Sequence, residues 1–143
     1  NLVSWSYQAE ALAEIAACVK PGGLYLTSEG WEEGMVGLNL RRRRVGLPPI
    51  TVVEHNLLMS RICFEREAGK YFDFVGYIGA GLYLYMSRIF QPLFVLPNVP
   101  SHLHPINKLA SGLQVLSFSE ADFSDCDYAG VYVLRRKELV RES

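Results

Sequence analysis

The sequence lacks both a strong charge bias and a cysteine framework. Its 143 residues include 14 lysines and arginines against 15 aspartates and glutamates, so no global attraction to nucleic acid or to an anionic membrane is indicated. The three cysteines, Cys18, Cys63 and Cys126, are widely spaced and form no CxxC pair, which excludes a disulfide framework and favours a reducing, cytoplasmic setting. Cys18 falls in an apolar helical pattern, and we expect it to be a small buried residue.

Long unbroken hydrophobic runs are also missing. The longest apolar region, 72–96, is interrupted by Asp73, Arg88, Gln91 and several glycines, whereas a membrane span needs about 20 nearly unbroken apolar residues. No basic-then-apolar signal peptide stands at the start. The chain begins with Asn1 and enters directly into a structured pattern, which we interpret as a fragment or a processed product.

Neither a metal site nor a nucleic-acid surface is predicted. His102 and His104 stand two residues apart in a proline-containing loop, and neither Asp122 nor Asp125 supplies a convincing third ligand. The arginine run 41–44 would cover all faces of a helix, whereas a phosphate-binding surface needs more basic residues with aromatics between them. We expect these arginines to form a solvated helix end, with an anionic ligand as the alternative.

Helix and strand patterns alternate along the chain. Half of the residues are hydrophobic and a fifth are charged, which is typical of a globular domain. The periodicity predicts helices over 7–19, 32–45, 82–96 and 105–116, an ambiguous short helix within 57–67, and strands over 24–28, 71–78 and 128–136. The polar segment 117–127 is expected to be a surface connection. Lys20 suits the C-terminal end of the first helix, and Pro21-Gly22-Gly23 ends it.

The first strand pattern decides the predicted fold class, which is α/β. Residues 24–28 are short and almost continuously apolar, as in a buried strand of a parallel sheet. A lone parallel strand is not stable, and the sequence offers it no obvious neighbours. The pattern therefore predicts the trailing end of an α/β sandwich whose leading strands lie upstream.

Several segments in order resemble the C-terminal half of class I S-adenosylmethionine-dependent methyltransferases. They are Val19-Lys20-Pro21-Gly22-Gly23-Leu24-Tyr25-Leu26, Ser28-Glu29-Gly30-Trp31-Glu32-Glu33-Gly34, Leu38-Asn39, Arg42, Gly46-Leu47-Pro48-Pro49-Ile50, His55-Asn56 and the run 83–92 (YLYMSRIFQP). The first looks like the junction between a helix and the fifth strand of that family. Residues from 97 onward match only loosely.

The resemblance implies a Rossmann-like sheet of seven strands, of which residues 1–143 supply the last three. The final two strands would form an antiparallel hairpin with a long helical connection at about 82–116. The family's glycine-rich cofactor loop and the acidic residue that holds the ribose are missing, and the glycines of 76–81 lack the strand–loop–helix context. The resemblance thus implies S-adenosylmethionine as the parent's cofactor, with no cofactor-binding residue in this chain and the missing N-terminal half as its partner.

Candidate site residues are few, and each has a plainer interpretation. Glu29, at a strand end, could face the methyl acceptor or be a solvated carboxylate. His55 could be a general base, although a lone loop histidine is more often structural. Asn39 and Arg42 fall on the resembling pattern and become substrate-binding candidates through it.

Two further candidates lie in the helical connection. Tyr83 could line an acceptor pocket under a lid, although core packing is the more common role of such a residue. Arg88 is hard to bury without a partner, which makes it the better candidate there.

Two functions follow from these observations. The first is transfer of a methyl group from S-adenosylmethionine to a small-molecule or glycan-like acceptor, by direct displacement accelerated through alignment of the reacting atoms. The second is a non-catalytic interaction or structural domain with a methyltransferase-like half fold. In either case we expect the fragment to be inactive alone, and marginal or aggregation-prone in isolation.

Overall fold

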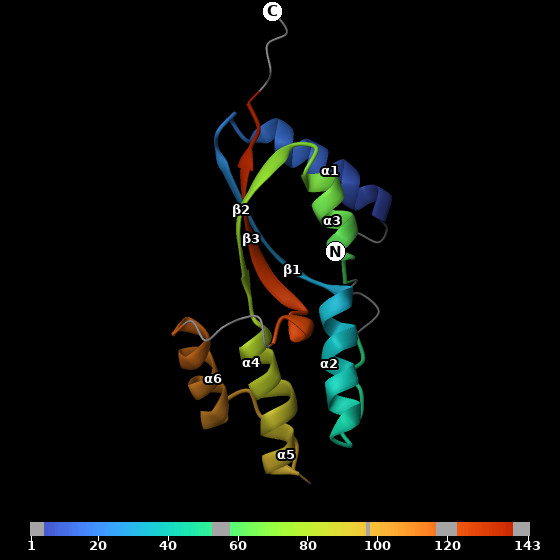
Figure 1. Ribbon diagram of the computed structural model, residues 1–143, viewed down its shortest axis with the longest axis vertical. Helices are drawn as coiled ribbons and strands as arrows, with labels where there is room; N and C mark the ends of the chain where they lie inside the picture. Colours follow the sequence, from blue (N-terminus) through green and yellow to red (C-terminus); the bar gives the residue numbers. More distant parts are fainter. Residues whose placement is uncertain (1–4, 53–57, 97, 117–122, 139–143) are drawn as a thin grey trace, which may run out of the picture. The chain divides into compact units, whose positions relative to one another are not determined.

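The computed structural model describes residues 5–52, 58–96, 98–116 and 123–138. The fold is mixed α/β, with a three-stranded antiparallel sheet and several helices (Figure 1). The chain divides into two compact units. The sheet unit comprises Asn1–Gly30, Val52–Ile78 and Gly130–Ser143, and the helical unit comprises Trp31–Thr51 and Gly79–Ala129.

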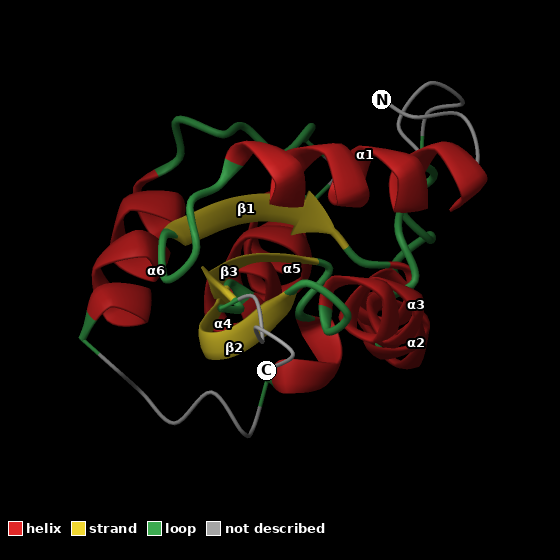
Figure 2. Ribbon diagram, turned by 90° about the horizontal axis from the view of Figure 1, so that it is seen from above, coloured by secondary structure: helices red, strands yellow, loops and turns green. Residues whose placement is uncertain are grey.

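The sheet has the strand order β1 (Leu24–Gly30), β3 (Ala129–Arg136), β2 (Phe72–Gly79). Viewed from above, β3 lies between β1 and β2 (Figure 2). The register is set at one end, where the Gly22 amide donates to the Arg136 carbonyl at 2.9 Å and the Lys137 amide donates to the Tyr71 carbonyl at 3.0 Å. The expectation that the chain offers the first strand no neighbour was wrong, because β3 pairs with β1 in the opposite direction.

Two helices, α1 (Trp5–Cys18) and α3 (Arg61–Ala68), lie on one side of this sheet (Figure 1). Beneath them the chain buries Phe64, Phe72, Tyr132 and Leu134, all at most 3% exposed. Aromatic contacts join this layer, with ring centroids 5.3 Å apart for Phe64 and Tyr132. The core of the sheet unit is therefore an aromatic layer between the strands and α3.

The turn into β1 depends on a glycine. Gly22 has φ of 74°, a left-handed conformation that glycine adopts without steric cost, so the chain reverses directly after α1. The strand that follows is not buried as expected, since Leu24 and Leu26 are 54% and 61% exposed. Their side chains alternate with those of Tyr25 and Thr27 and occupy the opposite face of the strand.

The helical unit contains α2 (Glu32–Arg44), α4 (Gly81–Tyr85), a π-helical turn η1 (Met86–Phe90), α5 (Gln91–Val95), α6 (Pro105–Val115) and a 3₁₀ turn η3 (Ser124–Cys126). Leu38, Leu47, Ile89 and Cys126 form its buried core. Close approach of α2 to η3 requires Gly37, because a Cβ atom there would lie 1.8 Å from the Asp125 carbonyl oxygen.

Most predicted elements match the structure to within a few residues, and two further corrections apply. Cys18 is exposed rather than buried, because it is the last residue of α1. The segment 117–127 is not wholly a surface connection, since Cys126 is fully buried and Asp127 is 4% exposed. Among the described residues, no helix is long and apolar enough to cross a membrane.

Candidate functional site

The Asn39 side chain on α2 ties the following loop back to its own helix. Its Nδ2 donates to the Ile50 carbonyl at 3.1 Å, and its Oδ1 accepts from the Ile50 amide at 2.8 Å. This double hydrogen bond mimics one rung of a strand ladder and uses both ends of the amide. Asn39 therefore holds the loop at Ile50 against α2.

Arg42 is buried, has no carboxylate partner among the described residues, and donates instead to backbone carbonyls. Its side chain is 8% exposed, with Nε donating to the Pro48 carbonyl at 2.8 Å and Nη1 donating to the Arg88 carbonyl. Burial lowers the pKa of Arg42, and the nearby charge of Arg88 lowers it further. The guanidinium thereby joins the end of α2, the Pro48 loop and η1.

Arg88 lies on the π-helical turn, and its side chain is exposed. A π-helical turn leaves the ordinary helical hydrogen bonding locally interrupted, and such turns are frequent at functional sites. Here the Arg88 carbonyl accepts from Arg42. Three of the predicted site residues, Asn39, Arg42 and Arg88, are thus linked around the C-terminal half of α2.

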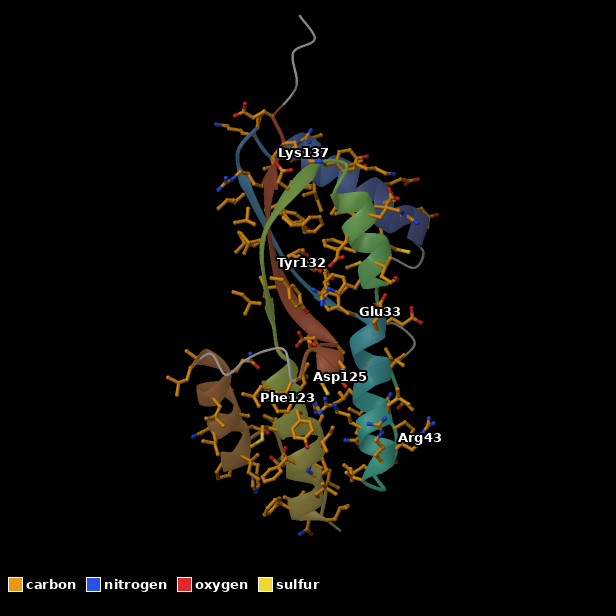
Figure 3. The ribbon with its side chains drawn as sticks, viewed as in Figure 1. Glu33, Arg43, Phe123, Asp125, Tyr132 and Lys137 are labelled. Atoms are coloured by element: carbon orange, nitrogen blue, oxygen red, sulfur yellow. The ribbon has the colours of Figure 1, made fainter. Side chains whose placement is uncertain are left out.

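Arg41, the neighbour of Arg42, makes a different set of contacts. Its Nε donates to Oδ2 of Asp125 at 2.8 Å, and its guanidinium carbon lies 5.5 Å from the ring centre of Tyr85 and 5.8 Å from that of Phe123. The hydrogen bond from Arg41 to Asp125 raises the pKa of Arg41 despite partial burial. Figure 3 shows Asp125 and Phe123 close together in this unit.

A pocket of about 210 Å³ opens beside this pair, lined by Arg41, Arg44, Val45, Tyr85 and Ile89. The lining combines two guanidinium groups with an aromatic ring and two aliphatic side chains. A lining of cationic and apolar side chains suits a small molecule that has both hydrogen-bond acceptors and a nonpolar part. We take this pocket as the candidate ligand site.

Asp127, which lies between η3 and β3 in the chain, is buried against Gly79 and Gly81 at the start of α4. A Cβ atom on Gly79 would lie 1.9 Å from its Oδ2, and one on Gly81 would lie 2.8 Å from its Oδ1. The carboxyl group therefore occupies the space that these two glycines leave open. The glycines of 76–81 serve this internal contact, so this segment does not fit a phosphate or cofactor cradle.

The other predicted residues lie elsewhere. Glu29 is the next-to-last residue of β1 in the sheet unit, where the buried Thr27 hydroxyl donates to its Oε1 at 2.7 Å. Tyr83 is half-buried on α4, and its backbone amide donates to Oε1 of Gln114 on α6 at 3.0 Å. His55 lies outside the described residues.

A polar cluster that sequence reasoning missed lies in the sheet unit. Arg61 Nε is shared between the Tyr132 hydroxyl at 2.7 Å and Glu65 Oε1 at 3.1 Å, and its guanidinium carbon lies 4.0 Å from the ring centre of Tyr77. The Tyr132 hydroxyl also donates to Glu65. Burial opposes the charge of Arg61, but the hydrogen bonds and the neighbouring phenols raise its pKa, while burial raises the pKa of Tyr132.

Little in the sequence indicates that Arg41 contacts Asp125 or that Arg61 contacts Tyr132. Asp125 lies 84 positions after Arg41, and Tyr132 lies 71 positions after Arg61, so no local spacing connects them. The only local sign is the spacing of Arg61 and Glu65, which are four residues apart on one helix face. In the parts of the chain that the structure describes, no three His, Cys, Asp or Glu side chains are grouped so as to hold a metal ion.

Comparisons with known proteins give no relative. No family model, no curated protein and no solved structure matches the chain.

Proposed function

We propose that this chain is the C-terminal, acceptor-side part of a class I S-adenosylmethionine-dependent methyltransferase, with a small-molecule or glycan-like acceptor and a cytoplasmic location. The observation that carries the proposal is the arrangement around Lys20-Pro21-Gly22-Gly23. A helix, a left-handed glycine turn, an extended strand and a second helix follow one another in the order that the resemblance implies.

The remaining strands support the same proposal. β2 and β3 are antiparallel neighbours, as expected for the final pair, and the chain between them is helical at α4, η1, α5 and α6. β1 lies at the edge of the sheet, so its outer backbone groups have no strand beside them among the described residues. An edge strand with exposed Leu24 and Leu26 is a site for further pairing and packing, which the missing half of a methyltransferase sheet would supply.

The chain's own contribution would be to bind and orient the acceptor. In the candidate pocket, Arg41 is held by Asp125, whereas Arg44 forms no ion pair among the described residues and can donate to an acceptor's oxygens. Tyr85 offers a ring face of the kind that packs against sugars and other small rings. Fixed donors beside an apolar wall restrict the orientation of a bound molecule, which is how alignment raises a transfer rate.

The residues present do not fit S-adenosylmethionine itself. Gly79 ends β2 and Gly81 begins α4, but the Asp127 carboxyl group fills the space beside both glycines, so this junction leaves no room for a cofactor phosphate or sulfonium group. The proposal therefore assigns the cofactor site to residues upstream of this chain, and none of the catalytic steps is assigned to His55 or Glu29.

Calorimetric titration of S-adenosylmethionine into the complete polypeptide tests the proposal. We expect saturable one-to-one binding by the complete polypeptide and none by the 143-residue chain alone. An Arg44→Ala variant should bind the cofactor normally, because its pocket serves the acceptor. Failure of the complete, folded polypeptide to bind S-adenosylmethionine would sink the proposal, as would an upstream reading frame without a glycine-rich strand–loop–helix.

The exposed edge of β1 favours a second candidate, a non-catalytic interaction domain that pairs with another chain. Sedimentation of the complete polypeptide separates the two ideas. Self-association that is lost when Leu24 and Leu26 are changed to lysine, together with absent cofactor binding, would favour the interaction domain.

A further inference from the structure

The end of the helical unit at which α2 and α5 terminate exposes large apolar side chains. Phe94, Leu96, Val99 and Leu103 are between 58% and 89% exposed, and they follow one another within ten residues of chain. The ring of Phe94 also packs against that of Phe90 at a tilt of 42°, with ring centroids 4.6 Å apart, so the two rings contact each other at the surface. We call Phe90, Phe94, Leu96, Val99 and Leu103 the apolar tip.

The charge of the helical unit is sharply divided. No aspartate or glutamate lies between Asp73 and Glu120, or between Glu33 and Glu54, so the segments that form this end carry no carboxylate. In the helical unit, the carboxylates whose positions are described lie at the start of α2 (Glu32, Glu33), in η3 (Asp125) and directly after η3 (Asp127). Figure 3 shows Glu33 at one end of α2 and Arg43 near the other.

Two exposed cations lie on the elements that end with the apolar tip. Arg43 and Arg88 are exposed and form no ion pair among the described residues, in contrast to Arg41, which is neutralised by Asp125. Arg88 precedes Phe90 by two residues, and Figure 1 places the C-terminal ends of α2 and α5 at the same end of the unit. Among the described residues, this surface has exposed Phe and Leu side chains, arginines without ion pairs and no carboxylate, and such a surface is complementary to the boundary between anionic headgroups and acyl chains.

From these observations we propose that the apolar tip and these two arginines dock the protein on an anionic membrane surface. Phe94 and Leu96 enter the headgroup–acyl boundary, and Arg43 and Arg88 contact lipid phosphates. The apolar side chains are separated in sequence by Asn98, Ser101 and His102, so they do not form the continuous stripe that a groove in a protein partner would bind. Attachment is peripheral, and it does not depend on whether the protein transfers methyl groups.

Co-sedimentation of the complete polypeptide with vesicles tests the docking. The vesicles contain phosphatidylcholine alone, or phosphatidylcholine with about one third phosphatidylglycerol. We expect binding to the anionic vesicles and little to the neutral ones, with the difference shrinking as salt is raised.

Two double variants divide the contributions. Arg43→Gln/Arg88→Gln should weaken partitioning to the anionic vesicles roughly 25-fold, since each basic residue near an anionic surface contributes about fivefold. Phe94→Ser/Leu96→Ser should weaken it by roughly tenfold or more through lost apolar burial. The controls are Val115→Ser/Leu116→Ser, which are more exposed than Phe94 and Leu96 and lie at the end of α6, and Arg66→Gln/Arg135→Gln, two exposed arginines of the sheet unit of which Arg66 pairs with Glu67. Both controls should bind as the parent protein does.

Three outcomes would overturn the proposal. The first is equal binding to neutral and anionic vesicles, and the second is a control that loses as much binding as its partner variant. The third is concentration-dependent self-association that Phe94→Ser/Leu96→Ser abolishes while vesicle binding stays absent, which would assign the apolar tip to a second copy. Cofactor titration on the same samples keeps this result separate from the proposed methyltransferase function.

Discussion

Each of the two units holds one arginine between a carboxylate and two aromatic rings. In the sheet unit, Arg61 donates to Glu65 and lies over Tyr77 and Tyr132. In the helical unit, Arg41 donates to Asp125 and lies near Tyr85 and Phe123. The side chains of the two arginines are also similarly exposed, at 32% and 31%.

The two arginines differ in whether a ligand could reach them. The Tyr132 hydroxyl takes part in the hydrogen bonds of Arg61, so that cluster is closed by its own partners. The rings near Arg41 offer only their faces, and the same arginine borders the candidate pocket. The comparison indicates a structural tie in the sheet unit and a ligand-facing cation in the helical unit.

The largest expected effect breaks the closed cluster. Tyr132 is 3% exposed and contacts the rings of Phe64, Phe74 and Tyr77. Tyr132→Ala should lower the free energy of unfolding by about 3–5 kcal/mol, since it removes a buried ring and leaves a cavity. Tyr132→Phe keeps the ring and should cost only about 1–2 kcal/mol for the lost hydroxyl. Urea denaturation measures both, and equal losses would show that the aromatic packing is not what Tyr132 contributes.

A second variant tests the buried arginine of the helical unit. Arg42→Met fills a similar volume but leaves the Pro48 and Arg88 carbonyls without their donor, so we expect a loss of about 2–3 kcal/mol in urea denaturation. Arg43→Met, one position along and exposed, should change stability by less than about 0.5 kcal/mol. If the two substitutions prove equally mild, the guanidinium of Arg42 does not hold the loop and η1 together.

Local features of the fold could be predicted from the sequence, whereas long-range ones could not. Periodicity predicted the helices and strands because each depends on local spacing, as at α2 and α6. It misjudged β1, where a short run of apolar residues looks the same whether a strand is buried on both faces or has Leu24 and Leu26 exposed. The neighbour of a strand is a long-range property, and only the structure shows that β3 pairs with β1.

The candidate site was predictable only in part, for the same reason. Asn39 and Arg42 were singled out by resemblance, and Arg88 because an arginine is hard to bury without a partner, although the structure exposes its side chain. The structure ties these residues through backbone carbonyls that a sequence pattern does not reveal. The pocket beside Arg41 depends on Asp125, which lies 84 positions away in a segment expected to be a surface connection. A charged pair formed by chain topology leaves no periodic signal.

A third prediction uses cysteine ionisation to compare the units. Burial raises the pKa of Cys126 from 9.0 to about 12, whereas Cys18 in the sheet unit is exposed. Between pH 9.0 and about 12 the folded state retains the thiol proton that the unfolded state loses. The stabilising contribution of Cys126 is therefore fully present below pH 9.0 and is lost as the pH rises through this window.

The free energy of unfolding is measured against pH in the unsubstituted protein (the parent protein) and in a Cys126→Ala variant, and the difference isolates this contribution. The parent should lose stability more steeply than the variant above pH 9.0, while titration of tyrosines and lysines affects both. At neutral pH, a thiol-specific reagent should modify Cys18 rapidly and Cys126 only on unfolding. Identical pH slopes in the two proteins would mean that the Cys126 thiol ionises as readily when folded as when unfolded.

Of the substitutions that remove a contact, Asp125→Asn at the Arg41–Asp125 pair should have the smallest effect on stability. Its result decides whether the clusters of Arg41 and Arg61 differ in their roles. The side chains of the pair are 31% and 51% exposed, so Asp125→Asn should cost no more than about 1 kcal/mol. A double-mutant cycle of Arg41→Met with Asp125→Asn should give a coupling energy of about 0.5 kcal/mol. The corresponding cycle of Arg61→Met with Tyr132→Phe should give a larger one, because the Tyr132 hydroxyl is buried and hydrogen-bonds to both Arg61 and Glu65. A coupling at Arg41 as large as that at Arg61 would make both clusters structural ties, and the pocket beside Arg41 would then lose its distinction as the ligand site.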